Sequence, residues 1–112
     1  MMRRSITRKE LKEKLDHNEK VRLVDLRMRD SCEIEHIKGA MCVPFNELVE
    51  TAEDVFKKDE EIVVYCGSDR CADGPAAAKL LENRGFKKVF EFDGGIEDWK
   101  DGDFPVERRS MR

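Results

Sequence analysis

The chain has no long apolar run and no excess of basic charge, and each absence narrows what it can do. No stretch approaches the roughly 20 apolar residues of a membrane-spanning helix, so we expect no membrane contact. Lysine and arginine total 22 against 25 acidic residues, and no basic stripe is present to follow a nucleic-acid backbone. The basic start, Met1–Ser5, is not followed by the apolar segment of a signal peptide, so a cytoplasmic location is expected.

Repeats, linkers and low-complexity segments are also missing. A chain of 112 residues is long enough for one domain with one core and too short for two. We expect this domain to span residues 5–107 and the polar tail, 108–112, to be frayed. The expected state in solution is a monomer or a weak homodimer.

The four cysteines do not form a known metal motif. In a reducing compartment such cysteines are more often free or catalytic than disulfide-bonded. Cys66 and Cys71 have C-x4-C spacing with no second pair to complete a tetrahedral site, and Cys32 with His36 more often marks one packed helix face. We therefore expect no metal and no cofactor, and we expect Cys32 and Cys42 to be packing residues.

Short apolar segments alternate with segments that carry helix signals. Strands are predicted at 22–26, 40–43, 62–65 and 88–92. Helices are predicted from the capping box Thr7–Glu10, from Asp30 to Lys38–Gly39, from Asn46, from about Pro75 to Asn83, and after Gly94–Gly95. This alternation is typical of an α/β fold with a parallel sheet covered on both faces.

Cys66 occupies the most informative position, directly after the apolar strand 62–65 and before the loop that feeds a helix. Open parallel sheets bind ligands at the carboxyl ends of their strands. A loop before a helix also offers unpaired N–H groups and the positive end of the helix dipole. Such surroundings favour a thiolate, so Cys66 is predicted to be a nucleophile; the alternative is a buried structural cysteine.

Several short motifs occur in the order found in one protein family. They are Val24–Arg27, His36–Ala40, Cys42–Phe45, Val63–Cys66, and Gly85–Val89 with Asp93–Trp99. With these motifs the chain resembles the single-domain rhodaneses, which are sulfurtransferases, from about Ile6 to Val106. The resemblance implies a rhodanese-like fold, with a five-stranded parallel sheet and helices on both faces. It also implies that Cys66 takes up a sulfane sulfur as a persulfide and passes it to a thiol or other acceptor.

The loop after this cysteine departs from the family's usual C-R-x-G-x-R. Gly67 follows the cysteine, Cys71 stands at the last position, and the one remaining arginine, Arg70, is flanked by Asp69 and Asp73. A loop with two carboxylates beside one guanidinium is expected to bind an anionic ligand weakly. We therefore expect a small thiol-type sulfur donor or a persulfidated protein, with a thiol as acceptor, in place of thiosulfate.

The loop is also predicted to bind the substrate. Its residues are Gly67, Ser68, Asp69, Arg70, Cys71 and Ala72. The small Gly67 and Ser68 let the backbone curl around the sulfur, where N–H groups can stabilise a thiolate or persulfide. Asp25, Arg27 and His36 are predicted to support the pocket wall and its turns without reacting.

Two other functions stay open on the sequence alone. Attack by Cys71 on a Cys66 persulfide would release sulfide and leave a disulfide, which describes a persulfide reductase or a dithiol redox protein with Cys71 as the resolving thiol. The arginine-poor loop also fits a catalytically silent module that binds a partner. A cysteine phosphatase is disfavoured because Arg70 falls too early after the cysteine to chelate phosphate.

Overall fold

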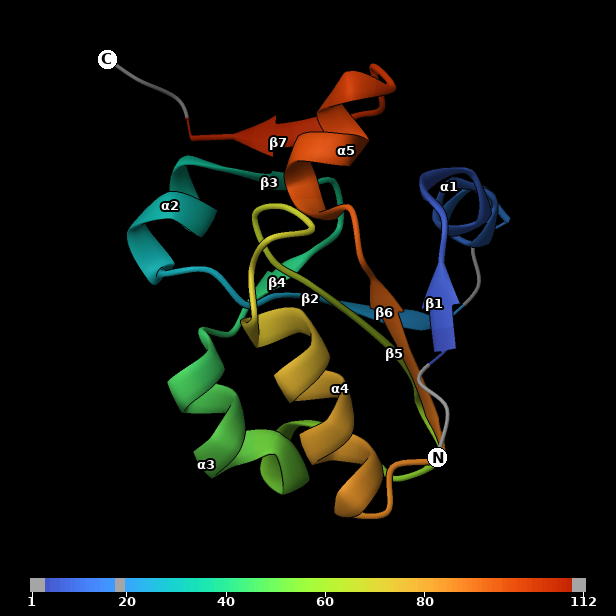
Figure 1. Cartoon of the computed structure of the whole chain (residues 1–112), viewed down its shortest axis with the longest axis vertical. Helices are drawn as coiled ribbons and strands as arrows, with labels where there is room; N and C mark the ends of the chain where they lie inside the picture. The colour runs from blue at the N-terminus through green and yellow to red at the C-terminus, as the bar shows by residue number, and fades with distance from the viewer. Residues whose placement is uncertain (1–3, 18–19, 110–112) are drawn as a thin grey trace.

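The computed structural model describes residues 4–17 and 20–109, and within them the chain folds around a parallel sheet of five strands (Figure 1). The strand order is β1-β6-β5-β2-β4. The strands of this sheet are β1 (Arg4–Ile6), β2 (Val21–Asp25), β4 (Met41–Cys42), β5 (Glu61–Tyr65) and β6 (Lys88–Phe92). The predicted α/β fold class is confirmed. β1 is not predicted by the sequence pattern, because its first two residues are exposed and polar.

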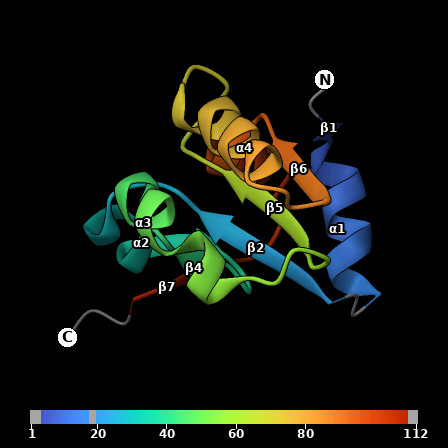
Figure 2. The same cartoon turned by 90° about the horizontal axis from the view of Figure 1, so that it is seen from below.

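Different helices cover the two faces of the sheet (Figures 1 and 2). One face carries α3 (Phe45–Val55) and α4 (Asp73–Asn83), and the other carries α1 (Arg8–Asp16) and α5 (Gly95–Asp101). None of the described helices is long and apolar enough to cross a membrane.

Strand β5 shows how both faces are filled from one segment. Its side chains alternate, so that Ile62 and Val64 join the core under α3 and α4 while Val63 and Tyr65 join the core under α1 and α5. All four are buried. A strand with two covered faces reads as a continuous apolar run, which is why this run was visible in the sequence.

A second, two-stranded sheet lies beyond the carboxyl ends of the main strands (Figure 1). It pairs β3 (Glu35–Ile37) with β7 (Val106–Arg108) in antiparallel register. The amide of Arg109 also donates to the carbonyl of Ile34 over 2.9 Å. The predicted fraying of the tail 108–112 is therefore wrong as far as Arg109, and residues 110–112 lie outside the described residues.

The predicted start of a helix agrees with the structure where the side chain at that position makes a capping hydrogen bond. The Thr7–Glu10 capping box is confirmed at the start of α1. The predicted start at Asp30 is wrong: α2 (Arg29–Ile34) follows Met28, which makes no side-chain cap bond, and the chain turns into β3 before reaching Gly39.

Two further boundaries differ from the sequence prediction. Asn46 lies inside α3 and does not cap it, because Pro44 is the residue that precedes the helix. α4 begins two residues before Pro75, which still lies in the first turn of the helix. Gly85 follows the end of α4 and has a φ of 93°. This positive φ explains why a glycine occupies the position.

Candidate active site

Cys66 follows β5 directly and its position is fixed by the first turn of α5. It is buried, with 8% of its surface exposed. Its carbonyl accepts a hydrogen bond from the amide of Ile96 and the carbonyl of Gly67 accepts one from Glu97, both over 3.0 Å. Gly95 has a φ of 67°, and a Cβ there would lie 2.7 Å from the backbone carbon of Gly67. The absence of a side chain at Gly95 therefore allows α5 to approach the reactive loop.

Cys71, in the same loop, is joined to Cys66 by a disulfide with a Cα–Cα distance of 6.2 Å. Inside the ring that this bond closes, the amides of Arg70 and Cys71 donate to the hydroxyl and carbonyl of Ser68, over 3.3 and 3.2 Å. In this oxidised form two of the loop amides are therefore engaged within the loop. The convergence of loop amides on the Cys66 sulfur stays a prediction for the reduced form.

A pocket of about 410 Å³ opens beside Cys66. Its apolar walls come from Leu26 and Met28, which follow β2, and from Pro44 and Phe45, which follow β4. The pocket thus lies where the carboxyl ends of β2, β4 and β5 meet, as expected for an open parallel sheet.

The loop residues predicted to bind substrate are distributed unevenly around this pocket. Asp69, Arg70 and Ala72 are exposed, and Gly67, Ser68 and Cys71 are half-buried. Arg70 does not line the pocket, whereas Arg27 does. The cation beside Cys66 therefore comes from the β2–α2 connection.

The charge of Arg27 is already balanced by a buried carboxylate. Its Nε and Nη2 atoms donate to Asp25 at 2.9 to 3.2 Å, and Nη2 also donates to the carbonyl of Glu35. Asp25 is fully buried, which makes this pairing necessary. These contacts are what a supporting role for Asp25 and Arg27 requires, and they leave little positive charge for an anionic donor.

Tyr65 belongs to the same buried network, and sequence reasoning missed it. Its hydroxyl accepts a hydrogen bond from the amide of Ile37 over 3.0 Å and bonds to Asp25. Burial, and then the nearby Asp25 carboxylate, raise the pKa of Tyr65 far above its ordinary value, so the hydroxyl stays neutral and donates to that carboxylate. The available signal was a polar-tipped aromatic at the end of an apolar strand.

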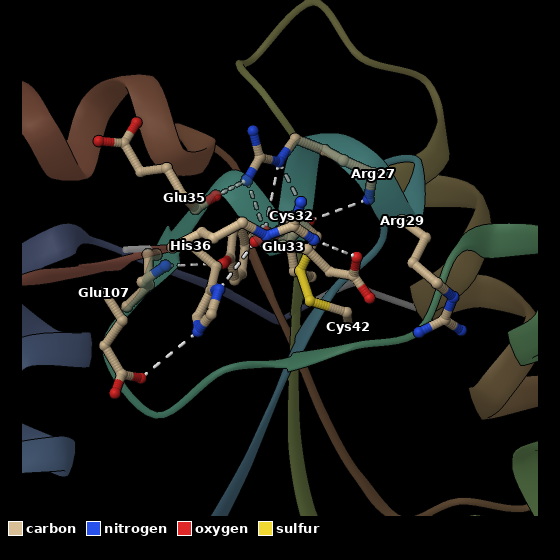
Figure 3. The surroundings of a disulfide bond; sticks show 12 residues. Arg27, Arg29, Cys32, Glu33, Glu35, His36, Cys42 and Glu107 are labelled. Carbon is tan, nitrogen blue, oxygen red and sulfur yellow. Dashed lines mark hydrogen bonds and ion pairs between the residues drawn. A yellow bond between two sulfur atoms is a disulfide. The ribbon is translucent and has the colours of Figure 1, made fainter. Parts of the chain in front are cut away.

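His36 holds its own turn. Its Nδ1 lies 2.7 Å from the carbonyl of Cys32, and its Nε2 lies 3.4 Å from a carboxylate oxygen of Glu107 (Figure 3). A hydrogen bond from the amide of Gly39, and to a smaller extent the charge of His36, lower the pKa of Glu107. His36 does not line the Cys66 pocket.

Cys32 and Cys42 form a second disulfide, with a Cα–Cα distance of 5.9 Å (Figure 3). The prediction that they are unlinked packing residues is wrong. The two cysteines lie in α2 and β4, and only the fold brings them together. Donor atoms of Cys32, His36 and Cys42 lie within 4.8 Å of one another, as do those of Cys66, Cys71 and Asp73. Because each sulfur pair is joined, neither group offers thiolates here, and the expectation of no metal stays a prediction.

Several known proteins are similar to this chain in sequence and in fold. The profile of the rhodanese-like domain matches residues 7–102. The thiosulfate sulfurtransferase GlpE of Vibrio cholerae is 33% identical over 85 residues, covering 76% of this chain and 77% of GlpE. The putative sulfur carrier protein YrkF of Bacillus subtilis is 33% identical over 88 residues, covering 79% of this chain. The chain spans only 46% of YrkF.

Solved structures agree with these sequence matches. The solution structure of the rhodanese-like domain of the Alr3790 protein from Anabaena sp. superposes with a TM-score of 0.86 at 32% identity. The match covers 96% of this chain and 81% of that structure.

Proposed function

The chain belongs to the rhodanese-like domain family, and from this membership we propose that it is a sulfurtransferase carrying sulfane sulfur as a persulfide on Cys66. The observation that carries the proposal is the placement of Cys66. It follows β5 at the carboxyl edge of the sheet and lines a pocket of about 410 Å³. Relatives named as a thiosulfate sulfurtransferase and as a putative sulfur carrier support the same chemistry.

The reaction begins with a reduced loop. The Cys66 thiolate attacks the outer sulfur of a donor persulfide, the donor's S–S bond breaks, and the donor leaves as a thiolate. An acceptor thiolate then attacks the outer sulfur now held on Cys66 and takes it away as a new persulfide. Cys66 returns to the thiolate form. The net reaction moves one sulfur atom between two thiols and needs no outside oxidant or reductant.

The charges around the pocket favour a thiol-type donor over thiosulfate. Arg27 is neutralised by Asp25, and the loop's own Arg70 is exposed and outside the pocket. Among the described residues that line this largely apolar pocket, no cation is left unpaired to meet an anionic donor. A small persulfide or a persulfidated protein as donor, with a thiol as acceptor, suits the pocket better.

A second function, persulfide reduction, is favoured by the Cys66–Cys71 disulfide. In this scheme the Cys71 thiolate attacks the inner sulfur of the Cys66 persulfide, sulfide leaves, and the disulfide forms. A dithiol then supplies two electrons and two protons to restore both thiols. The two schemes share their first step and differ in what happens to the outer sulfur.

Intact-protein mass spectrometry of the reduced chain tests the first step. After incubation with a low-molecular-weight persulfide, we expect the wild type to gain the mass of one sulfur atom and peptide mapping to place it on Cys66. The same incubation with thiosulfate should load the protein more slowly. Equal loading of Cys66→Ala would refute the role of Cys66. No loading of the wild type by either donor would refute the proposal and favour a silent binding module.

Release of sulfide separates the two functions. The Cys71→Ser variant should accept sulfur as the wild type does, because Cys66 is retained. If Cys71 resolves the persulfide, this variant holds its sulfur longer and releases less sulfide in the absence of an acceptor. Release at the wild-type rate would instead assign the chain to transfer alone.

A further inference from the structure

Helix α2 buries a single side chain against the rest of the fold. Among the described residues of α2, Cys32 alone is buried. Ile34 at its end and Met28 before its start are 55% and 77% exposed. A helix of six residues has little stability of its own, so its position depends on tertiary contacts. Two bonds from outside the helix reach the backbone of α2: the amide of Arg109 donates to the carbonyl of Ile34 over 2.9 Å, and Nδ1 of His36 lies 2.7 Å from the carbonyl of Cys32.

The contacts of the other side chains of α2 are weak. Ion pairs join Arg29 to Glu47 and Glu33 to Arg109, but all four side chains are at least 41% exposed. Exposed ion pairs of this kind contribute little, because water and salt screen them. Among the side chains of α2, Cys32 therefore makes the strongest attachment, through its bond to Cys42 in β4.

This disulfide, drawn in Figure 3, joins two segments that each continue into one wall of the Cys66 pocket. One wall includes Met28 and Ser31, and Ser31 immediately precedes Cys32. The other wall begins at Pro44, two residues after Cys42. Cys42 is also paired across the sheet with Asp25, which anchors the buried network described above. A bond between residues 32 and 42 thus connects the two segments that carry these walls.

We propose that Cys32 and Cys42 form a second thiol–disulfide site, whose oxidised form holds the walls of the Cys66 pocket together and whose reduced form releases α2. Cys42 is half-buried and Cys32 is buried, so an incoming thiolate of a dithiol meets Cys42 first. The Cys32–Cys42 bond breaks, a mixed disulfide forms on Cys42, and Cys32 leaves as a thiolate and takes up a proton. The second thiol of the reductant then displaces Cys42, and the disulfide has gained two electrons and two protons in all.

Hydrogen exchange of the full chain tests the structural half of this proposal. In the Cys32→Ala/Cys42→Ala variant, the hydrogen-bonded amides of residues 32–35 should exchange at least about tenfold faster than in the oxidised wild type, because the disulfide that closes the loop 32–42 is lost. The wild type reduced with dithiothreitol should behave the same way. Amides of α4 should change much less and so report that both samples remain folded.

A matched variant removes the other disulfide. Cys66→Ala/Cys71→Ala should leave exchange in α2 at the oxidised wild-type rate, because the Cys32–Cys42 bond is intact. Equal α2 exchange in all samples, or an air-oxidised protein in which peptide mapping finds no link between Cys32 and Cys42, would overturn the proposal.

The effect on the pocket is measured by alkylation of Cys66, which requires a thiol and no sulfur transfer. In a Cys71→Ala background, iodoacetamide should modify Cys66 about threefold faster or more when Cys32 and Cys42 are also alanine, since the pocket is then less enclosed. Equal rates would contradict the coupling. Because the probe needs no persulfide, this result is independent of the function proposed above.

Discussion

At the scale of single residues, Asp25 ties together the segments that surround the Cys66 pocket. Its carboxylate is buried at the end of β2. It accepts hydrogen bonds from the guanidinium of Arg27 and from the hydroxyl of Tyr65. The hydroxyl of Tyr65 in turn accepts a hydrogen bond from the amide of Ile37 in β3. The Asp25 carboxylate and the Tyr65 hydroxyl are buried, so the loss of one partner leaves a buried polar group unsatisfied.

Replacement of Tyr65 by phenylalanine tests this network. The ring stays in the core, but the Ile37 amide and the Asp25 carboxylate each lose a partner, so the free energy of unfolding should fall by about 1–3 kcal/mol. Urea denaturation with an unchanged m-value measures the effect. Ser5→Ala is the control, because its hydroxyl bonds Asp93 at an exposed site and its loss should change stability by less than about 0.5 kcal/mol. A Tyr65→Phe variant as stable as this control would contradict the network.

These residues also show which parts of the site could be predicted from sequence. Cys66 was found because a buried strand, a polar loop and a helix follow one another locally. The partner of Tyr65 and the bond between Cys32 and Cys42 depend on contacts between different elements, and no local pattern carries them. Asp69 and Arg70 were predicted to bind substrate, but both are exposed. The sequence could not show this, because the exposure of a side chain is set by the fold.

At the scale of elements, the site depends on how closely α5 approaches the loop after β5. Gly95 begins α5 with a φ of 67°, and a Cβ there would contact the backbone of Cys66 and Gly67. Gly85, after α4, has a φ of 93°, but a Cβ there would meet nothing within 4 Å. The two glycines share the left-handed conformation and differ in the space around them.

Replacement of each glycine by alanine separates the cost of the left-handed backbone conformation from the cost of a steric clash at the Cβ. Gly85→Ala should cost about 1–2 kcal/mol of unfolding free energy, from the left-handed conformation alone. Gly95→Ala should cost more and should also slow sulfur loading of Cys66, because the α5 turn must move away from the loop. Thermal unfolding and the persulfide-loading assay measure the two effects. Equal behaviour of the two variants would show that the close approach is unimportant.

The β3–β7 ribbon gives the structure a pH-dependent contact. Glu35 in β3 bonds Lys100 of α5 at 2.7 Å and also pairs with Arg108 of β7. The hydrogen bond from Lys100, and then that from Arg108, lower the pKa of Glu35 below 4.5 in the folded chain. A lowered folded-state pKa means that the stabilisation is complete above 4.5 and is lost as the pH falls through the lower folded value.

The variant Glu35→Gln isolates this contribution. Wild type should be more stable than the variant at neutral pH, and the difference should stay constant down to about pH 4.5 and then shrink as the pH falls towards about 3. Added salt should also reduce it, because Lys100 and Arg108 are exposed. Denaturation curves at each pH measure the difference in unfolding free energy between the two proteins. A difference that stays constant over the whole range would exclude the ionisation of Glu35 as its source.

The short strands of this ribbon, and β1, were the elements that the sequence did not predict. β1, β3 and β7 have three residues each, and most of their side chains are not buried. Alternation over so short a segment carries almost no signal, and their pairing depends on a neighbour already in place. The longer buried strands β5 and β6 were predicted to within one residue at either end.

At the scale of the whole molecule, the fold leaves few large apolar side chains on its surface. Among the described residues, those that are exposed are Met28 and Ile34, at either end of α2. A stable protein–protein interface buries about 1,200–2,000 Å² in total, and two side chains supply only a small part of that area.

We accordingly expect a monomer at micromolar concentration and at most weak pairing when concentrated. Sedimentation velocity over a wide range of concentration should give the mass of a single chain at the dilute end. Any increase at the concentrated end should disappear in the Met28→Ser/Ile34→Ser variant, because that change removes the exposed apolar surface of α2 without touching its buried Cys32. The measurement should be made on oxidised protein, since free thiols can link chains covalently. A dimer that persists at the dilute end in both proteins would require an interface elsewhere on the molecule.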